Sequence, residues 1–326
     1  MTYFLIINPK AKGGRSRKLT DSIFSRLDAS RIAYEFKIID DISEAVEYSS
    51  LANKKGYDVI VAVGGDGTIR AVMNGFYDDE GRRISTSAMG IIYTGTSPDF
   101  CKSYQIPLNI DDAIHTLLNN HRQQIAVGKI VFSEQNNNSL TDLAITNCKI
   151  TKTEYFGCCA NIGIGSRVAR IANSGIRKYL GDFLGTFISL ISSILKFHPS
   201  DQSVVLNGVP CSISKLYNLS IGKTRYIASG IKVFNQLNPD SKQLYCIVAR
   251  DFTLLRLPGI LKNAYSGKRF KNSERFYLEY IEQIEIQGNC ENPEIELDGD
   301  PSGYLPCKIE IAKDYLTLVT NEREMA

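Results

Sequence analysis

The sequence is poor in several patterns that mark specialised classes of protein. It has three histidines and no Cys-x-x-Cys pair, so a zinc site is not expected. Its eight cysteines are scattered, mostly in apolar contexts, which predicts buried reduced thiols in a cytoplasmic protein and not a disulfide framework. The formal net charge of +3 is close to neutral, and the basic residues are spread along the chain. Nucleic acid is therefore not an expected partner.

A membrane-spanning pattern is also missing. Segment 1–8 has no basic residue and too short an apolar run for a signal peptide. The apolar stretch 179–197 contains Asp182 and Lys196, and its large apolar residues recur at helical spacing. We expect an amphipathic helix that packs against the protein, with additional contact to lipid as the alternative.

The first third of the chain alternates predicted strands and helices. Apolar runs predict strands at 3–7, 33–39, 58–63 and 89–93. Helical periodicity predicts helices at 16–27, at 43–52 with Ser43 as the N-cap, and from 67 to 76. This order is typical of a parallel sheet covered by helices on both faces.

From about residue 125 the pattern changes to short alternating segments separated by turn residues. The expected strands are 125–132, 141–150, 202–206, 212–221, 244–248, 276–286, 294–297 and 308–311. They predict an antiparallel β-sandwich or barrel, with helices inserted around 166–197 and 252–266. A length of 326 residues suits two domains. We expect them at 1–124 and 125–326, with the last residues as candidates to return to the first domain.

The strongest chemical signal is the string Val61–Thr68, in which a buried strand runs into three glycines and an acid before a helix. Glycines allow the backbone to approach a phosphate closely, and the helix N-terminus supplies positive potential. Asp66 would oppose a phosphate unless a cation lies between them, so it is interpreted as a magnesium ligand. The alternative is a tight turn with a capping aspartate.

Two more turns follow predicted strands, at 8–14 and 93–100. Ligands of open α/β sheets collect at the carboxyl ends of the strands, so these turns are candidate phosphate contacts. The first offers charge from Lys10, Lys12 and Arg15, and the second offers hydroxyls from Thr94 and Thr96. Asp99 is a candidate second carboxylate at the metal. Each turn taken alone could be ordinary turn chemistry.

As a set, these strings resemble the bacterial diacylglycerol kinases and related lipid kinases, a superfamily that includes sphingosine and ceramide kinases. The matching elements are 7–9, 63–68 with Asn74-Gly75, Gly95-Thr96 with Asp99-Phe100, and 297–301 with Gly303 and Pro306. Weaker matches are 161–165 and 180–181. The resemblance implies a two-domain enzyme, with a nucleotide-binding α/β domain and a β-sandwich domain for the lipid, and with ATP in the cleft between them.

The resemblance also implies roles for individual residues. The implied nucleotide contacts are Asn8, Pro9, Lys10, Gly64, Gly65, Asp66, Gly67, Thr68, Thr94, Gly95 and Thr96. Asp66 and Asp99 would hold Mg²⁺, and Asp300 would accept the proton of a lipid hydroxyl such as that of diacylglycerol. Asp298 would support the metal or orient that base. The alternative for 298–300 is a hairpin turn. The expected protein is cytoplasmic and associates peripherally with the membrane that carries its lipid substrate.

The sequence departs from the family pattern at several positions. Asp300 replaces the usual glutamate and is one methylene shorter, and Ser97-Pro98 replaces Gly-Asn beside the nucleotide. Ser241-Lys242 occupies the positions where the family often has an acid that binds a structural metal. A glycine triplet is reduced to Ala228-Ser229-Gly230. The structural metal site is therefore not carried over to this chain.

Two other functions remain open from the sequence. The Gly64–Thr68 loop also occurs in NAD kinases, although the Asn8-Pro9 entry and the late Asp-Gly-Asp element are not expected there. The departures also allow a catalytically inactive protein that binds lipid or nucleotide.

Overall fold

The computed structural model describes residues 1–10, 17–134, 151–171, 197–228, 230–251, 266, 272–288 and 294–321. They form two compact units. The first comprises Met1–Val127 together with the chain from Ala312 onward, and the second comprises Gly128–Ile311. The first unit therefore includes residues from both ends of the sequence.

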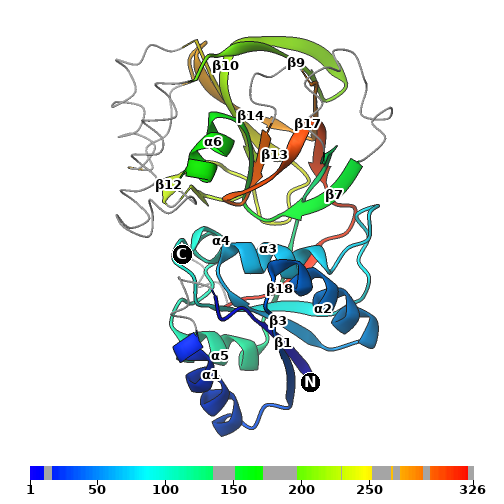
Figure 1. The fold of residues 1–326 in the computed structure, drawn as a ribbon, viewed down its shortest axis with the longest axis vertical. Coiled ribbons are helices and arrows are strands. Elements are labelled where there is room, and N and C mark those ends of the chain that lie inside the picture. The colour runs from blue at the N-terminus through cyan, green and yellow to red at the C-terminus, as the bar shows by residue number, and fades with distance from the viewer. Residues whose placement is uncertain are drawn as a thin grey trace. The chain divides into compact units, whose positions relative to one another are not determined.

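The first unit is built on a six-stranded sheet with the order β2-β1-β3-β4-β18-β5 (Figure 1). Its strands are β1 (Tyr3–Ile7), β2 (Tyr34–Ile38), β3 (Val59–Gly64), β4 (Ala88–Tyr93), β5 (Arg122–Ile125) and β18 (Leu316–Val319). The pairs β1–β2, β1–β3, β3–β4 and β4–β18 are parallel, and β5 pairs antiparallel with β18. The predicted parallel sheet is confirmed, whereas β5 and β18 were not expected.

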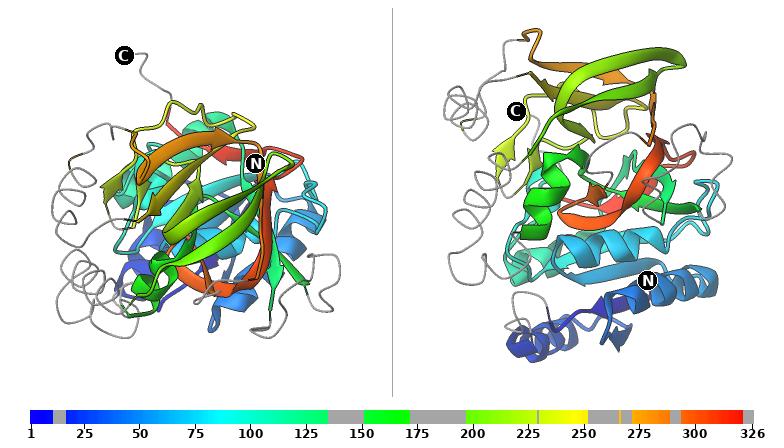
Figure 2. Two further views of the ribbon diagram at one scale, coloured as in Figure 1. Left: turned by 90° about the horizontal axis from the view of Figure 1, so that it is seen from above. Right: turned by 45° about the horizontal axis from the view of Figure 1, so that its top comes forward.

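Helices cover both faces of this sheet (Figures 1 and 2). They are α1 (Arg17–Ala29), α2 (Ile42–Lys55), α3 (Asp66–Asn74), α4 (Asp99–Ser103) and α5 (Ile110–Asn119). One face of the sheet shares a core with α1 and α5, whereas α2 packs on α3. β3 and β4 are buried along their whole length, because they lie in the middle of the sheet between these layers.

The N-cap of α2 corrects one expectation. Asp41, and not Ser43, precedes the helix, and its carboxylate accepts a hydrogen bond from the Ser43 backbone N–H at 2.9 Å. The Glu44 carboxylate in turn accepts a hydrogen bond from the Asp41 backbone N–H at 3.0 Å. This capping box satisfies backbone donors that the helix itself cannot pair, which explains why the helix begins earlier than the apolar pattern predicts.

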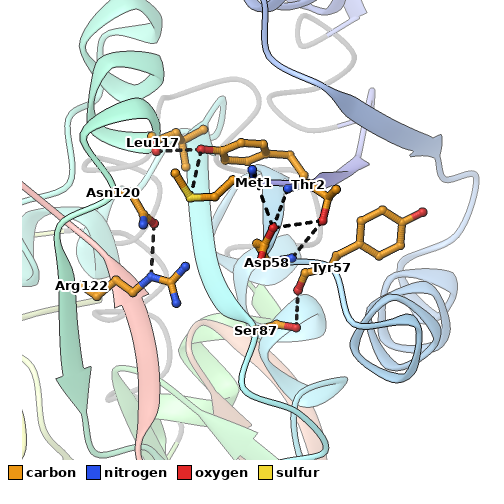
Figure 3. Close-up of polar contacts among 9 residues, drawn as sticks. Met1, Thr2, Tyr57, Asp58, Ser87, Leu117, Asn120 and Arg122 are labelled. Atoms are coloured by element: carbon orange, nitrogen blue, oxygen red, sulfur yellow. Dashed lines mark hydrogen bonds and ion pairs between the residues drawn. The ribbon is translucent and has the colours of Figure 1, made fainter.

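The amino ends of the strands carry a polar cluster around Asp58 (Figure 3). The Asp58 carboxylate accepts hydrogen bonds from the backbone N–H and the hydroxyl of Thr2, at 2.7 and 3.2 Å. The bond from the N–H lowers the pKa of Asp58 below its ordinary value of 3.8. The ionised form is favoured in the folded state, so this stabilisation is present above pH 3.8 and is lost as the pH falls through the folded pKa.

The second unit is an antiparallel β domain. Its strands are β6 (Gly128–Ser133), β7 (Thr151–Phe156), β8 (Cys159–Gly163), β9 (Ser200–Leu206), β10 (Val209–Gly222), β11 (Tyr226–Ile227), β12 (Ile231–Lys232), β13 (Leu244–Arg250), β14 (Phe276–Ile281), β15 (Gln283–Ile286), β16 (Glu294–Leu297) and β17 (Asp300–Ile311), with the helix α6 (Ile164–Ile171) after β8. The main sheet has the order β14-β13-β10-β8-β16-β17-β15-β9, and β9 also pairs with β10. Six strands therefore close into a ring around one apolar core.

This unit confirms the predicted antiparallel β class and corrects two details. The expected single strand 276–286 is two strands, because the chain changes partners at Glu282: β14 pairs with β13, and β15 pairs with β9 and β17. β8 was not expected as a strand. The expected strand 141–150, the amphipathic helix 179–197 except its last residue, and the helix 252–266 except Ser266 lie outside the described residues.

None of the cysteines that the structure describes forms a disulfide, and five of them are buried. Cys211 is exposed, which differs from the expectation that the thiols are buried. In the described part of the chain, no helix combines the length and the apolar character needed to cross a membrane.

Candidate functional site

Three loops meet at the carboxyl ends of β1, β3 and β4. The backbone N–H of Asn8 donates to the Val63 carbonyl at 2.9 Å, and its side-chain amide donates to the Thr68 hydroxyl at 3.0 Å. The N–H of Thr94 donates to the Gly64 carbonyl at 2.9 Å. These bonds join the loop after β1 and the loop after β4 to the glycine turn between them. The sequence predicted this meeting of three motifs at one edge of the sheet.

Glycines allow two of these loops to touch. A Cβ atom added to Gly95 would lie 2.5 Å from the Gly65 Cα, and one added to Gly65 would lie 3.2 Å from the Gly95 Cα. A Cβ on Gly64 would overlap the Thr68 side chain. Real Cβ atoms do not come within 2.5 Å of a backbone atom, so this packing requires glycine at position 95, whereas a Cβ at position 65 would need the neighbouring loop to shift by a few tenths of an ångström.

The helix α3 begins directly at this turn. Gly65 is its N-cap and provides no side-chain acceptor, and Asp66 is its first residue. The first N–H groups of a helix have no partners within the helix, and they carry the positive end of its dipole. The turn therefore combines backbone that a ligand can approach closely with a positive potential suited to a phosphate.

Asp66 and Asp99 lie next to each other at this edge. The Asp66 carboxylate accepts a hydrogen bond from the Asp99 N–H at 3.2 Å, and the Asp99 side chain is 7% exposed. The Oδ1 atoms of both residues are buried. Below them, the pKa of the Cys101 thiol is raised, first by burial and then by the charge of Asp66. The site thus places two aspartates, Asp99 buried and Asp66 partly exposed, beside the glycine turn.

The other predicted contacts in this unit differ in their accessibility. Thr68 and Thr94 are buried, whereas Thr96 is exposed. The ammonium of Lys10 donates to the Asp40 carbonyl at 2.6 Å. Pro9 is partly exposed in the turn after β1, and Gly67 is partly exposed in the first turn of α3. Lys12 and Arg15 lie outside the described residues.

In the second unit, Asp298 and Gly299 form the hairpin turn between β16 and β17. Both have left-handed backbone, with φ of 50° and 98°. The Asp298 carboxylate accepts hydrogen bonds from three consecutive backbone N–H groups, at 2.8 to 2.9 Å, those of Gly157, Cys158 and Cys159. Asp298 therefore fastens the turn between β7 and β8 to this hairpin. Its predicted support of a metal or a base stays a prediction.

Asp300 is the first residue of β17 and lies opposite Leu297 in the hairpin. It is partly exposed. The hairpin thus presents a carboxylate next to a turn whose backbone is held in place by other groups. The predicted role of Asp300 as a base remains a prediction.

Glu296 is a further acidic residue of this unit that sequence reasoning missed. Its side chain is 5% exposed, and burial raises its pKa to about 8. It accepts hydrogen bonds from the Gly299 N–H and, at 2.5 Å, from the Asn161 amide. In the sequence, Glu296 is one of two glutamates that alternate with apolar residues in 294–297. This pattern is typical of the solvent-facing side of a strand, so it does not indicate a buried carboxyl group.

Comparison with known proteins finds two family models that match this chain. Residues 2–130 match the model of the diacylglycerol kinase catalytic domain, and residues 159–320 match the YegS C-terminal NAD kinase beta sandwich-like domain. The chain belongs to the bacterial diacylglycerol kinase family.

Relatives with this name match nearly the whole chain. The diacylglycerol kinase of Staphylococcus haemolyticus is 23% identical over 97% of this chain and 87% of its own. That of Staphylococcus saprophyticus is 25% identical over 97% of this chain and 94% of its own. A crystal structure of a diacylglycerol kinase from Bacillus anthracis has the same fold, with a TM-score of 0.67 at 20% identity over 98% of this chain and 97% of its own.

One departure from the diacylglycerol kinase pattern has a visible structural counterpart. Near Ser241-Lys242, the ammonium of Lys223 donates to the backbone carbonyls of Ser241 and Gln243, to the latter at 3.1 Å. Lys223 is buried, and this burial lowers its pKa to about 8. A cation carried by the chain itself therefore lies against the carbonyls of this loop.

The close approach of Gly65 and Gly95 generates a prediction. ATP is the ligand that the sequence predicts for this turn, and Gly95→Ala should force the two loops apart and weaken its binding by at least about tenfold, a loss of about 1.4 kcal/mol of binding free energy. The matched control is Gly90→Ala in β4, the strand that precedes this loop, where the new methyl group meets the Leu117 side chain in the core. Both variants should lower the melting temperature, but only Gly95→Ala should raise the Kd for ATP in calorimetry. Equal ATP affinity in both variants would contradict the prediction.

Proposed function

We propose that this protein is a lipid kinase that transfers the γ-phosphate of ATP, with Mg²⁺, to a hydroxyl group of a lipid such as diacylglycerol. The observation that carries this proposal is the contact between the Gly65 and Gly95 loops beside the Asp66–Asp99 pair. This arrangement lies within the domain that matches the diacylglycerol kinase catalytic model.

The residues present fit a nucleoside triphosphate. A polyphosphate needs backbone that it can approach closely and donors that carry positive potential. The glycine turn at Gly64–Gly65 and the N-terminus of α3 offer both. The exposed Thr96 hydroxyl adds a donor on the neighbouring loop. Asn8 and the buried Thr68 hydroxyl fix the shape of the turn through their mutual hydrogen bond.

The residues also fit a divalent cation. Carboxylate oxygens are preferred ligands of Mg²⁺, and Asp66 and Asp99 are hydrogen-bonded neighbours whose carboxylates each have one buried oxygen. These two residues would hold the ion. When bound, Mg²⁺ would neutralise phosphate charge that builds up during the transfer.

The acceptor side requires a group that takes the proton of the lipid hydroxyl. Asp300 is our candidate, because it is a partly exposed carboxylate at the start of β17. The Asp298 carboxylate already accepts hydrogen bonds from three backbone N–H groups, so its proposed role is to hold the hairpin that carries Asp300. A glutamate is usual at position 300 in the family, and an aspartate provides the same carboxylate on a shorter side chain.

The choice of acceptor provides the direct test of this function. The purified protein is incubated with labelled ATP and Mg²⁺ in mixed micelles, with diacylglycerol, sphingosine, ceramide or NAD as the acceptor. We expect a labelled phospholipid product and no phosphorylated NAD. Labelled NAD phosphate would establish the NAD-kinase alternative. Absence of turnover on every acceptor, with ATP still bound, would establish the inactive binding protein.

Two carboxylate substitutions separate metal binding from proton transfer. Asp66→Asn should abolish turnover with little change in melting temperature, because it removes charge from the proposed metal site and keeps the shape of the side chain.

Asp300→Asn should lower kcat by about 10²–10⁴-fold, the usual range for loss of a general base, and should leave the ATP affinity nearly unchanged. Asp300→Glu should retain substantial activity. An Asp300→Asn enzyme with near-full turnover would place the base elsewhere, and a large loss of thermal stability in Asp66→Asn would indicate a structural role.

Peripheral and reversible association with the membrane completes the proposal, because the substrate is a lipid. The candidate for lipid contact named from the sequence, the helix 179–197, lies outside the described residues except for its last residue. We expect the protein to float with vesicles of anionic phospholipid and diacylglycerol, and to be released by high salt or carbonate. A protein that only detergent releases would contradict this expectation.

A further inference from the structure

A row of buried polar side chains crosses three strands of the second unit. Glu296 on β16 lies opposite Asn161 on β8, and Asn161 lies opposite Ser220 on β10. Directly opposite residues of an antiparallel pair point to the same face of the sheet. Their neighbours along the strands, such as Ile295 and Ile162, belong to the apolar core. The row therefore lies on the opposite face of the sheet, where α6 packs against β8, β10 and β16.

Hydrogen bonds run along the row without interruption. The Asn161 amide donates to Glu296, and the Ser220 hydroxyl donates to the Asn161 carbonyl oxygen, each at 2.5 Å. The Asn218 amide donates to the Ser220 hydroxyl at 2.8 Å. The side-chain carbonyl of Asn218 accepts from the N–H of Gly165, in the first turn of α6, also at 2.8 Å.

At its other end, the row reaches the hairpin that carries Asp300. The Glu296 carboxyl accepts a hydrogen bond from the N–H of Gly299, the second residue of the turn. Asp298, the first residue of the turn, is fixed separately through its own carboxylate to the β7–β8 turn. Both residues of the turn are thus bound to groups outside it, and Asp300 follows them directly.

A glutamate at this position is costly for stability, because an acidic group loses its hydration when it is buried. Burial raises the pKa of Glu296, and the nearby charges of Asp298 and Asp300 raise it further. An apolar residue would fill the same space under α6 without that cost. What an apolar residue cannot provide is an acceptor for the Gly299 N–H, which points to a role for Glu296 at the turn.

We propose that Glu296 and Asn161 are positioning residues that hold the Asp298–Gly299 turn and so place the Asp300 carboxylate for the reaction. Asn161 orients the Glu296 carboxyl, and Glu296 binds the backbone of the turn. Neither residue is proposed to touch the substrate. This inference rests on the proposed function, in which Asp300 is the base.

The proposal predicts a specific pattern of kinetic changes. Glu296→Ala frees the Gly299 N–H, and misplacement of a catalytic group by about 1 Å can cost about 10²-fold in rate. We expect kcat to fall by about 10–100-fold, with the KM for ATP changed by less than about twofold. Glu296→Gln keeps one side-chain acceptor and should retain most of the turnover. Asn161→Ala should lower kcat in the same manner as Glu296→Ala, but less.

A double-mutant cycle with Asp300→Asn decides whether Glu296 acts through Asp300. If it does, Glu296→Ala should reduce the residual kcat of Asp300→Asn by less than about twofold, because the group that it positions is already removed. All rates are measured with the full-length enzyme on diacylglycerol micelles, below the melting temperature of each variant. If Glu296→Ala does not fold, the cycle is run with Asn161→Ala, which is expected to lower kcat in the same manner.

The matched control is Gln202→Ala on β9. Gln202 is fully buried in the same unit and donates to the Gln287 carbonyl at 2.7 Å, away from the hairpin. This variant should lower the melting temperature and leave kcat unchanged. A Glu296→Ala enzyme that behaves in the same way, less stable but with full turnover, would overturn the proposal and show a purely structural row.

The remaining outcomes separate this inference from the proposed function. Additive losses in the double mutant would overturn the positioning role and leave Asp300 as the base. Full turnover of the Asp300→Asn single variant would show that Asp300 is not the base, and this result would also overturn the positioning role proposed for Glu296. A loss of turnover in Glu296→Ala that is non-additive with Asp300→Asn supports both the positioning role of Glu296 and the assignment of Asp300 as the base.

Discussion

The parallel pairing of β1, β3 and β4 is the constraint on which the first unit depends. Parallel strands end at the same edge of a sheet, so the loops after these three strands must share one small region. The hydrogen bonds from Asn8 to Val63 and from Thr94 to Gly64 continue the sheet into these loops. The glycines then allow the loops to touch, and Asp66 and Asp99 are brought together as a consequence. The proposed nucleotide site is thus a product of the strand order.

In the second unit, the equivalent constraint is that the backbone N–H groups of the turns need acceptors, which carboxyl groups provide. A hairpin turn leaves N–H groups that the ladder of the sheet cannot pair, and a buried donor without a partner is costly. Asp298 satisfies three N–H groups of the neighbouring β7–β8 turn, and Glu296 satisfies that of Gly299. Two acidic residues within this short segment therefore have backbone partners, while Asp300 stays partly exposed.

The sequence predicts the first unit well, because its signals are local. Strand β1 was predicted with its observed bounds, and the motif 61–68 was placed correctly between a strand and a helix. The strands β5 and β18 were missed, because β18 pairs with a strand that is more than two hundred residues away and contains only four residues. A short segment of this kind carries little periodicity, and only the tertiary pairing shows that it belongs to the first sheet.

The parts of the site that the sequence could not reveal depend on register. Glu296 and Asn161 are separated by more than a hundred residues, and each alternates with apolar neighbours as a solvent-facing residue would. Only the pairing of β16 with β8 shows that they face each other under α6. The same holds for Asp298, whose Asp-Gly dipeptide predicts a turn but does not identify the three N–H groups that it binds.

Two features of this chain are then connected by geometry. An aspartate at position 300 reaches about 1.5 Å less far than the glutamate usual in the family, the length of one carbon–carbon bond. A longer side chain can compensate for a displaced backbone by changing its rotamers, whereas a shorter one has fewer rotatable bonds with which to do so. The position of the Asp300 carboxylate therefore depends more closely on the backbone of the turn. A buried glutamate that binds the Gly299 N–H, stabilised across the sheet by Asn161, restricts that backbone directly. In this interpretation, the shorter base and the costly buried carboxyl form one functional unit.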